Sequence, residues 1–209
     1  MNEQAERLIG LGVHELLGQS EEQVRAVAAA QADGGGGLLV PASVPCSYSD
    51  LMALVTHDGK PGFVVEDFTD AAEFAVTGGA NSDSILLPGG DWYTVHDPQR
   101  GDEFANASPA EALEAISAVG RMPLTMIEGI FWLYQRPELL ERNRCFMTIG
   151  SRKPKARGGF DARTPALWIS NGTGRDGAAH RNAPKLGWCW WNNRHTWLGI
   201  AHAAARTAI

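Results

Sequence analysis

The sequence predicts an α+β fold, in which an N-terminal helical pair precedes a mixed domain with an antiparallel C-terminal β-sheet. The helices are indicated by apolar residues at helical spacing between capping signals. The sheet is indicated by four short β-prone runs joined by basic, glycine-rich loops, at residues 145–149, 166–170, 187–191 and 196–201. Five of the seven tryptophans lie in this C-terminal third: Trp168, Trp188, Trp190, Trp191 and Trp197.

The first 37 residues predict two helices followed by a linker to the main domain. Residues 2–18 carry apolar side chains at helical spacing, and Ser20-Glu-Glu-Gln23 fits a capping box for a second helix. Four glycines at 34–37 cannot extend that helix, because each loses much conformational freedom on ordering. With 209 residues, we expect an N-terminal helical extension at 1–33, a glycine linker at 34–37 and a single α+β domain at 38–209.

The middle of the chain alternates short elements. Strands are expected at Leu38–Val40 and Gly62–Val65, and the segments Ile85–Leu87 and Trp92–Val95 are expected to pair as a hairpin. A short helix capped at Ser49-Asp50 is expected between these strands.

Two longer helices follow. Ser108-Pro-Ala-Glu111 places serine at the cap and proline in the first turn, which predicts a helix that Gly120 ends. At about 100° per residue, the helix expected at 125–135 has one broad apolar side. Glu128 falls on the other side, so we expect its charge to be solvated.

Composition narrows the class of protein. The chain is 44% hydrophobic and 20% charged, which is typical of a globular protein. No apolar run approaches the ~20 residues of a membrane helix, and the acidic N-terminus does not resemble a signal peptide. Three unpaired cysteines and no metal-ligand or cofactor motif predict reduced thiols, a cytoplasmic location, no metal and no cofactor.

The charges are divided unevenly along the chain. Residues 1–120 carry 19 acidic and 4 basic side chains, whereas residues 121–209 carry 5 acidic and 14 basic ones. Either the acidic part neutralises the basic part within the fold, or the basic part faces an anionic ligand. The first interpretation is favoured.

An antiparallel meander of the four C-terminal runs would bring two loops to one end of the sheet. Guanidinium groups and glycine-rich turns bind phosphate or carboxylate, so this end is the candidate ligand site. Mobile, solvated loops are the simpler alternative. The candidate ligand-binding residues are Arg152, Lys153, Arg157, Arg163, Asn192, Asn193, Arg194 and His195, while catalytic residues are unassigned.

Strand alternation places Trp188 and Trp190 on one face and Cys189 and Trp191 on the other. Core packing is the favoured role for these rings, and a stacking platform for bases or sugars is the alternative.

Three functions remain open. The favoured one is a non-enzymatic binding protein for an anionic small molecule or an acidic partner surface. The second is an enzyme that uses His195 with Cys189 in a pocket, and the third is an interaction protein that self-associates as a homo-oligomer through its acidic and basic faces. Nucleic acid is a less favoured partner, because the chain has a net charge of −6 and no recognised binding signature. No membrane contact is expected.

Several phrases resemble an uncharacterised family of high-GC bacteria: Asp97-Pro-Gln-Arg-Gly-Asp-Glu103, Gly120-Arg-Met-Pro-Leu-Thr125 with Glu128-Gly129, Cys145-Phe-Met-Thr-Ile-Gly-Ser-Arg152, Pro165-Ala-Leu-Trp-Ile-Ser170, and Pro184-Lys-Leu-Gly-Trp-Cys-Trp190 with His195-Thr-Trp-Leu-Gly199. The resemblance covers residues 38–206 and omits the N-terminal helices. It implies a cytoplasmic bacterial protein of unknown function, and it assigns no catalytic residue or cofactor.

Overall fold

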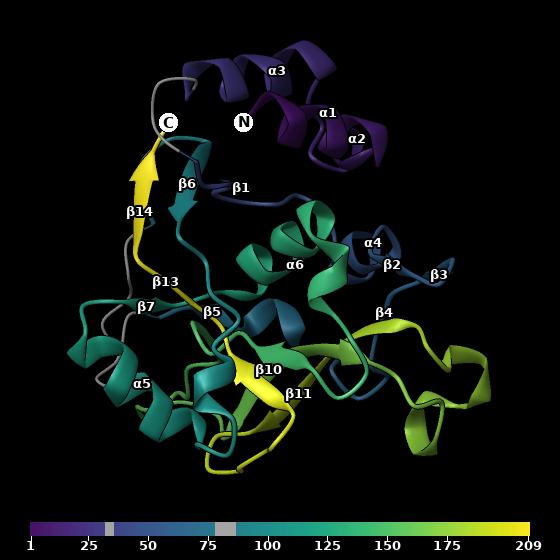
Figure 1. Cartoon of the computed structure of the whole chain (residues 1–209), viewed down its shortest axis with the longest axis vertical. Helices are drawn as coiled ribbons and strands as arrows, with labels where there is room; N and C mark the ends of the chain where they lie inside the picture. Colours follow the sequence, from purple (N-terminus) through teal and green to yellow (C-terminus); the bar gives the residue numbers. More distant parts are fainter. Residues whose placement is uncertain (32–35, 78–86) are drawn as a thin grey trace.

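The computed structural model describes residues 1–31, 36–77 and 87–209. Two sheets are arranged around one central helix, α6 (Met126–Gln135), as Figure 1 shows. The α+β class predicted from the sequence is confirmed. No helix within the described residues is long and apolar enough to cross a membrane.

Three N-terminal helices pack on the rest of the fold. They are α1 (Asn2–Gly10), α2 (Val13–Leu16) and α3 (Glu21–Ala30), and the capping box predicted at Ser20 is present. The single helix expected at 2–18 is interrupted, because Gly12 adopts a left-handed conformation with φ of 77°. The Gln4 side chain accepts a hydrogen bond from the Leu39 amide at 3.1 Å and donates one to the Gly37 carbonyl at 2.6 Å. Part of the predicted linker, residues 34–35, lies outside the described residues.

The smaller sheet has the order β1-β6-β14, formed by β1 (Leu38–Pro41), β6 (Trp92–His96) and β14 (Ala205–Ala208), all antiparallel. The predicted strand at 38–40 is confirmed. Of the predicted hairpin between 85–87 and 92–95, the second segment is the strand β6, which pairs with β1 on one side and β14 on the other. Residues 85–86 lie outside the described part of the chain.

The larger sheet has the order β12-β8-β10-β11-β4. Its strands are β12 (Leu198–Ile200), β8 (Cys145–Met147), β10 (Arg163–Ile169), β11 (Pro184–Trp190) and β4 (Phe63–Val64). The predicted meander holds for β8, β10 and β11, which pair antiparallel. It is wrong for β12, which runs parallel to β8 at the other edge. Residues 191–197 therefore cross to the opposite end of the sheet instead of forming a tight turn.

A close backbone approach explains where β12 lies. Gly101 has φ of 74° and no side chain that would separate the two backbones. The Ile200 amide therefore donates a hydrogen bond to the Gly101 carbonyl at 3.1 Å. A Cβ atom on Gly101 would lie 1.9 Å from the Ile200 carbonyl oxygen, and one on Gly199 would lie 2.5 Å from the Arg100 carbonyl oxygen. The loop at 97–104 thus covers β12 only because both positions are glycine.

The remaining elements are short. The helix α4 (Tyr48–Ala53) is capped by Ser47, two residues before the predicted cap, and α5 (Pro109–Ala118) begins at the predicted Ser108 capping box. Further strand pairs and 3₁₀ helices are β2 (Thr56–His57) with β3 (Lys60–Pro61), β5 (Ala75–Val76) with β9 (Ser151–Arg152), β7 (Met122–Pro123) with β13 (His202–Ala203), η1 (Ala71–Glu73), η2 (Asp102–Phe104), η3 (Pro137–Leu139), η4 (Gly174–Asp176) and η5 (Ala178–His180).

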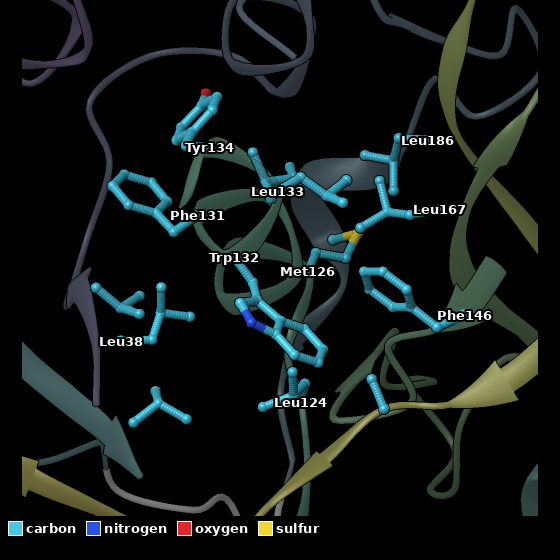
Figure 2. Close-up of a cluster of buried hydrophobic side chains, with 14 of the residues drawn as sticks. Leu38, Leu124, Met126, Phe131, Trp132, Leu133, Tyr134, Phe146, Leu167 and Leu186 are labelled. Carbon is cyan, nitrogen blue, oxygen red and sulfur yellow. The ribbon is translucent and has the colours of Figure 1, made fainter. Parts of the chain in front are cut away.

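The central helix α6 is buried on nearly all sides. Phe131, Trp132 and Tyr134 lie in one cluster with Leu167 and Leu186 of the larger sheet (Figure 2). A helix that is covered by protein on all sides has no solvated side. The predicted division of residues 125–135 into an apolar side and a polar, solvated side therefore does not hold.

The expectation that Glu128 is solvated is therefore wrong, because its residue is 0% exposed. Its carboxylate forms an ion pair with Arg206 of β14, accepts a hydrogen bond from Tyr93 Oη at 3.0 Å, and accepts another from the Thr125 amide at 2.7 Å. This buried ion pair joins α6 to the smaller sheet.

Candidate functional site

The candidate site lies at one end of the larger sheet, where the connection from β8 to β10 meets the end of β11. Register pairs Arg163 with Trp190, and the Trp191 amide donates to the Ala162 carbonyl at 2.7 Å. The two predicted loops therefore begin side by side. The second then turns away along residues 194–197 towards β12.

Two of the predicted cations are neutralised by carboxylates from the N-terminal half. Asp70 accepts hydrogen bonds from Arg163 at 2.5 and 3.0 Å and from Lys153 at 2.8 Å. Lys153 also contacts Glu73 at 2.9 Å, and Arg163 contacts Asp161 at 3.0 Å. Hydrogen bonding from Arg163 holds the pKa of Asp70 well below its ordinary value, and Lys153 acts in the same direction.

Arg194 is neutralised in a different place. It forms an ion pair with Glu111 of α5 and donates to the Asn106 carbonyl at 2.9 Å. The Asn106 amide in turn donates to the His195 carbonyl at 2.7 Å. Arg194 therefore anchors the crossing segment to α5 and does not join the other cations.

Arg152 differs from these three cations, because it is buried and has no carboxylate partner among the residues that the structure describes. The residue is 6% exposed, and its guanidinium carbon lies 3.6 Å from the centre of the Trp191 ring and 5.1 Å from that of Phe160. Its Nη2 donates to the Asp161 carbonyl at 2.9 Å, while its buried Nε has no hydrogen-bond partner within the described structure. Burial lowers the pKa of Arg152 to about 10, although the Asp161 charge opposes the shift.

Arg157 lies at the tip of the same loop. The Lys155 amide donates to the Gly159 carbonyl at 2.9 Å, which closes a tight turn, and Gly158 and Gly159 adopt φ of 87° and 72°. Arg157 is exposed, and no hydrogen bond or ion pair joins it to another part of the chain that the structure describes. Asn192 and Asn193 are also exposed at this end.

Cys189 and His195, the two residues of the second functional hypothesis, are in contact. Cys189 Sγ lies 2.6 Å from His195 Nε2, and both residues are half-buried. The His195 ring makes an edge contact with Trp197 at 5.3 Å between ring centres. Burial raises the pKa of Cys189 and lowers that of His195, so a neutral thiol beside a neutral imidazole is the resting form.

The tryptophans of β11 follow the predicted alternation. Trp188 and Trp190 pack edge to face at 4.8 Å between ring centres, while Trp191 stacks on Arg152. Trp190 is 47% exposed, so the end of this strand carries a large aromatic surface open to solvent.

The carboxylates that contact the cations were not predicted as part of the site. Asp70, Glu73 and Glu111 belong to the acidic half of the chain, and their partners belong to the basic half. The charge asymmetry was therefore the available signal, and these pairs agree with its first interpretation, neutralisation within the fold.

A separate cavity was also missed. It has a volume of about 500 Å³ and lies between α4, β4 and η1, where Glu66 is the one charged residue that lines it. It contains none of the predicted site residues. Among the described residues, no group of three or more His, Cys, Asp or Glu side chains is placed to hold a metal ion.

Comparison with known proteins agrees with the resemblance in the sequence. No curated protein and no solved structure matches the chain. A family of unknown function, DUF5701, matches residues 7–209. The expectation that the resemblance begins at residue 38 is wrong, since the match includes most of the N-terminal helices. The chain therefore belongs to this family of unknown function, DUF5701.

Proposed function

We propose that the protein binds an anionic small molecule, with a phosphate or carboxylate group, at the end of the larger sheet that carries Arg152 and Arg157. The observation that carries the proposal is the buried Arg152 guanidinium, which has no carboxylate partner among the described residues. Burial of an uncompensated charge is unfavourable, and an anion would remove that penalty.

The neighbouring cations support a small site. Asp70, Glu73, Asp161 and Glu111 already neutralise Lys153, Arg163 and Arg194, so these three hold the loops in place. Arg157 remains available at the loop tip to reach an approaching anion. The predicted set of eight ligand-binding residues is therefore narrowed to Arg152 and Arg157, together with Asn192 and Asn193, which are exposed just after β11 at the same end of the sheet.

A thermal-shift titration of the full chain tests the proposal. Inorganic phosphate, pyrophosphate, citrate and a short oligoglutamate are added at two salt concentrations. We expect at least one small anion to raise the melting temperature, because a ligand that binds the native state stabilises it. We expect Arg157→Ala to weaken binding about tenfold or more, since a charge-assisted hydrogen bond contributes roughly 1.5–3 kcal/mol.

Arg181→Ala is the matched control. Arg181 is an exposed arginine in the loop at the opposite end of the sheet, so its removal changes the net charge equally. An equal loss of the shift in both variants would show unspecific charge screening and overturn the proposal. A response to oligoglutamate alone would assign the site to an acidic protein surface instead.

We also propose that the protein is located in the bacterial cytoplasm. Its three cysteines are free thiols, which is typical of a reducing compartment. Fractionation of a host bacterium, followed by detection of the protein in the cytosolic or membrane fraction, tests this location.

A further inference from the structure

We propose that Cys189 and His195 form a second, reactive site, in which the thiol of Cys189 accepts an acyl group from an activated ester or thioester. This inference does not depend on the proposed anion site, with which it shares only Asn193. It is based on the 2.6 Å contact between Cys189 Sγ and His195 Nε2 and on the half-buried position of both residues.

The fold holds the two side chains together from both sides. Cys189 is fixed by the pairing of β11 with β10, where it lies opposite Thr164. His195 is fixed by its carbonyl, which accepts from the Asn106 amide, and by the neighbouring Arg194, which is bound to α5. The contact therefore joins a strand to a segment that is anchored independently.

The chemistry follows from the protonation state of the pair. Nε2 of the neutral imidazole accepts the thiol proton, so His195 is positioned as a general base. The Asn193 side chain also hydrogen-bonds to the sulfur and opposes the increase in the pKa of Cys189 that burial causes. An amide donor beside the sulfur is the kind of group that stabilises an oxyanion.

The acyl-transfer step is balanced within these groups. Sγ attacks the carbonyl carbon as the S–H proton moves to His195 Nε2, and a tetrahedral intermediate forms. The bond between the carbonyl carbon and the leaving oxygen or sulfur then breaks, and the imidazolium returns its proton to the leaving group. The products are a thioester on Cys189 and a free alcohol or thiol.

The other two cysteines provide internal comparisons. Burial raises the pKa of Cys145 to about 11, and its Sγ contacts the Glu141 carbonyl at 3.2 Å. Cys46 is half-buried, and within the described part of the chain no imidazole forms a hydrogen bond with its sulfur. If proximity to His195 determines reactivity, Cys189 should react before both of them.

The test uses p-nitrophenyl acetate as the acyl donor and the full chain as the acceptor. We expect release of one equivalent of p-nitrophenolate, with the acetyl group found by peptide mass spectrometry on Cys189. His195→Asn should slow this acylation at neutral pH about 100-fold, because a positioned general base contributes roughly 10²–10⁴-fold. Cys46→Ala, the matched control, should leave the rate unchanged.

The acylation rate of the unmodified protein, measured as a function of pH, tests the proposal even if a variant misfolds. General-base assistance predicts a rate that reaches a plateau once His195 is neutral, well below the pKa of the thiol. A rate that instead rises only as the thiol ionises would falsify the proposal, and so would equal acetylation of all three cysteines. Circular dichroism of His195→Asn separates a loss of the base from a loss of the fold.

Discussion

Arg152 and Arg206 both have a buried guanidinium group, but within the described residues only Arg206 forms an ion pair with a carboxylate. The Arg206 side chain is 3% exposed and its ion pair with Glu128 is completed by Tyr93 and by the Pro123 carbonyl at 2.9 Å. Arg152 is 6% exposed as a residue and lies between aromatic rings, with one backbone carbonyl as its hydrogen-bond acceptor. Full hydrogen bonding indicates a structural role for Arg206, whereas the Arg152 Nε without a partner in the described structure is the observation behind the proposed anion site.

The pKa values of these two arginines shift in opposite directions, because only Arg206 has a neighbouring carboxylate that outweighs the effect of burial. Burial alone lowers the pKa of an arginine, because it disfavours the charged form. At Arg206 the hydrogen bond and the charge of Glu128 outweigh burial and raise the pKa. At Arg152 nothing of comparable strength opposes burial, and the pKa falls.

The largest effect is expected when the compensated pair is broken. Glu128→Gln leaves Arg206 buried without a counter-charge, so we expect the free energy of unfolding to fall by roughly 3–5 kcal/mol. Urea denaturation, monitored by tryptophan fluorescence, measures this free energy of unfolding. A decrease below about 1 kcal/mol, within the scatter of surface substitutions, would contradict the structural role of the pair.

An intermediate effect is expected at Asp70, which neutralises the cations next to Arg152. The pKa of Asp70 is lowered in the folded protein, so its contribution to stability is present above its unfolded pKa of about 3.9 and is lost as the pH falls towards the folded value. Asp70→Asn should reduce stability at neutral pH and should show a flatter decline below about pH 4 than the unmodified protein. Urea midpoints across this pH range measure the difference.

The smallest effect on stability is expected at Arg152 itself. Arg152→Met removes a cation–π contact of up to roughly 2 kcal/mol but also removes an uncompensated buried charge, so the two changes offset each other. We expect the free energy of unfolding to stay within about 1 kcal/mol of the original value, while anion-induced stabilisation is lost. Arg206→Met is the matched control, and an equal loss of stability in both variants would remove the distinction between the two arginines.

Much of the fold could be predicted from local sequence. Ser20 and Ser108 begin helices because their side chains cap backbone amides, and that information lies within four residues. The partner of β12 could not be predicted in this way. It depends on the approach of Gly101 to Ile200, which only tertiary packing brings together.

The meeting of the two candidate loops at one end of the sheet could be predicted, because it follows from the order of adjacent strands. The cations of residues 152–163 precede or begin β10, so they lie at the end of the sheet where β11 ends. The sequence predicted this arrangement because β10 and β11 are consecutive strands that pair antiparallel. Asp70 lies 83 residues from Lys153, so its presence among them could not be read from local pattern. Glu128 was misassigned because periodicity separates two sides of a helix but does not reveal that protein covers both.

The position of β14 also has a consequence for protein synthesis. Arg206 follows its partner Glu128 by 78 residues and lies in β14, the last strand of the smaller sheet along the chain. A nascent chain in which α6 has already left the ribosome therefore contains an acidic side chain whose intended counter-charge has not yet been translated. The buried ion pair that joins α6 to the smaller sheet can therefore form only after β14 has been synthesised.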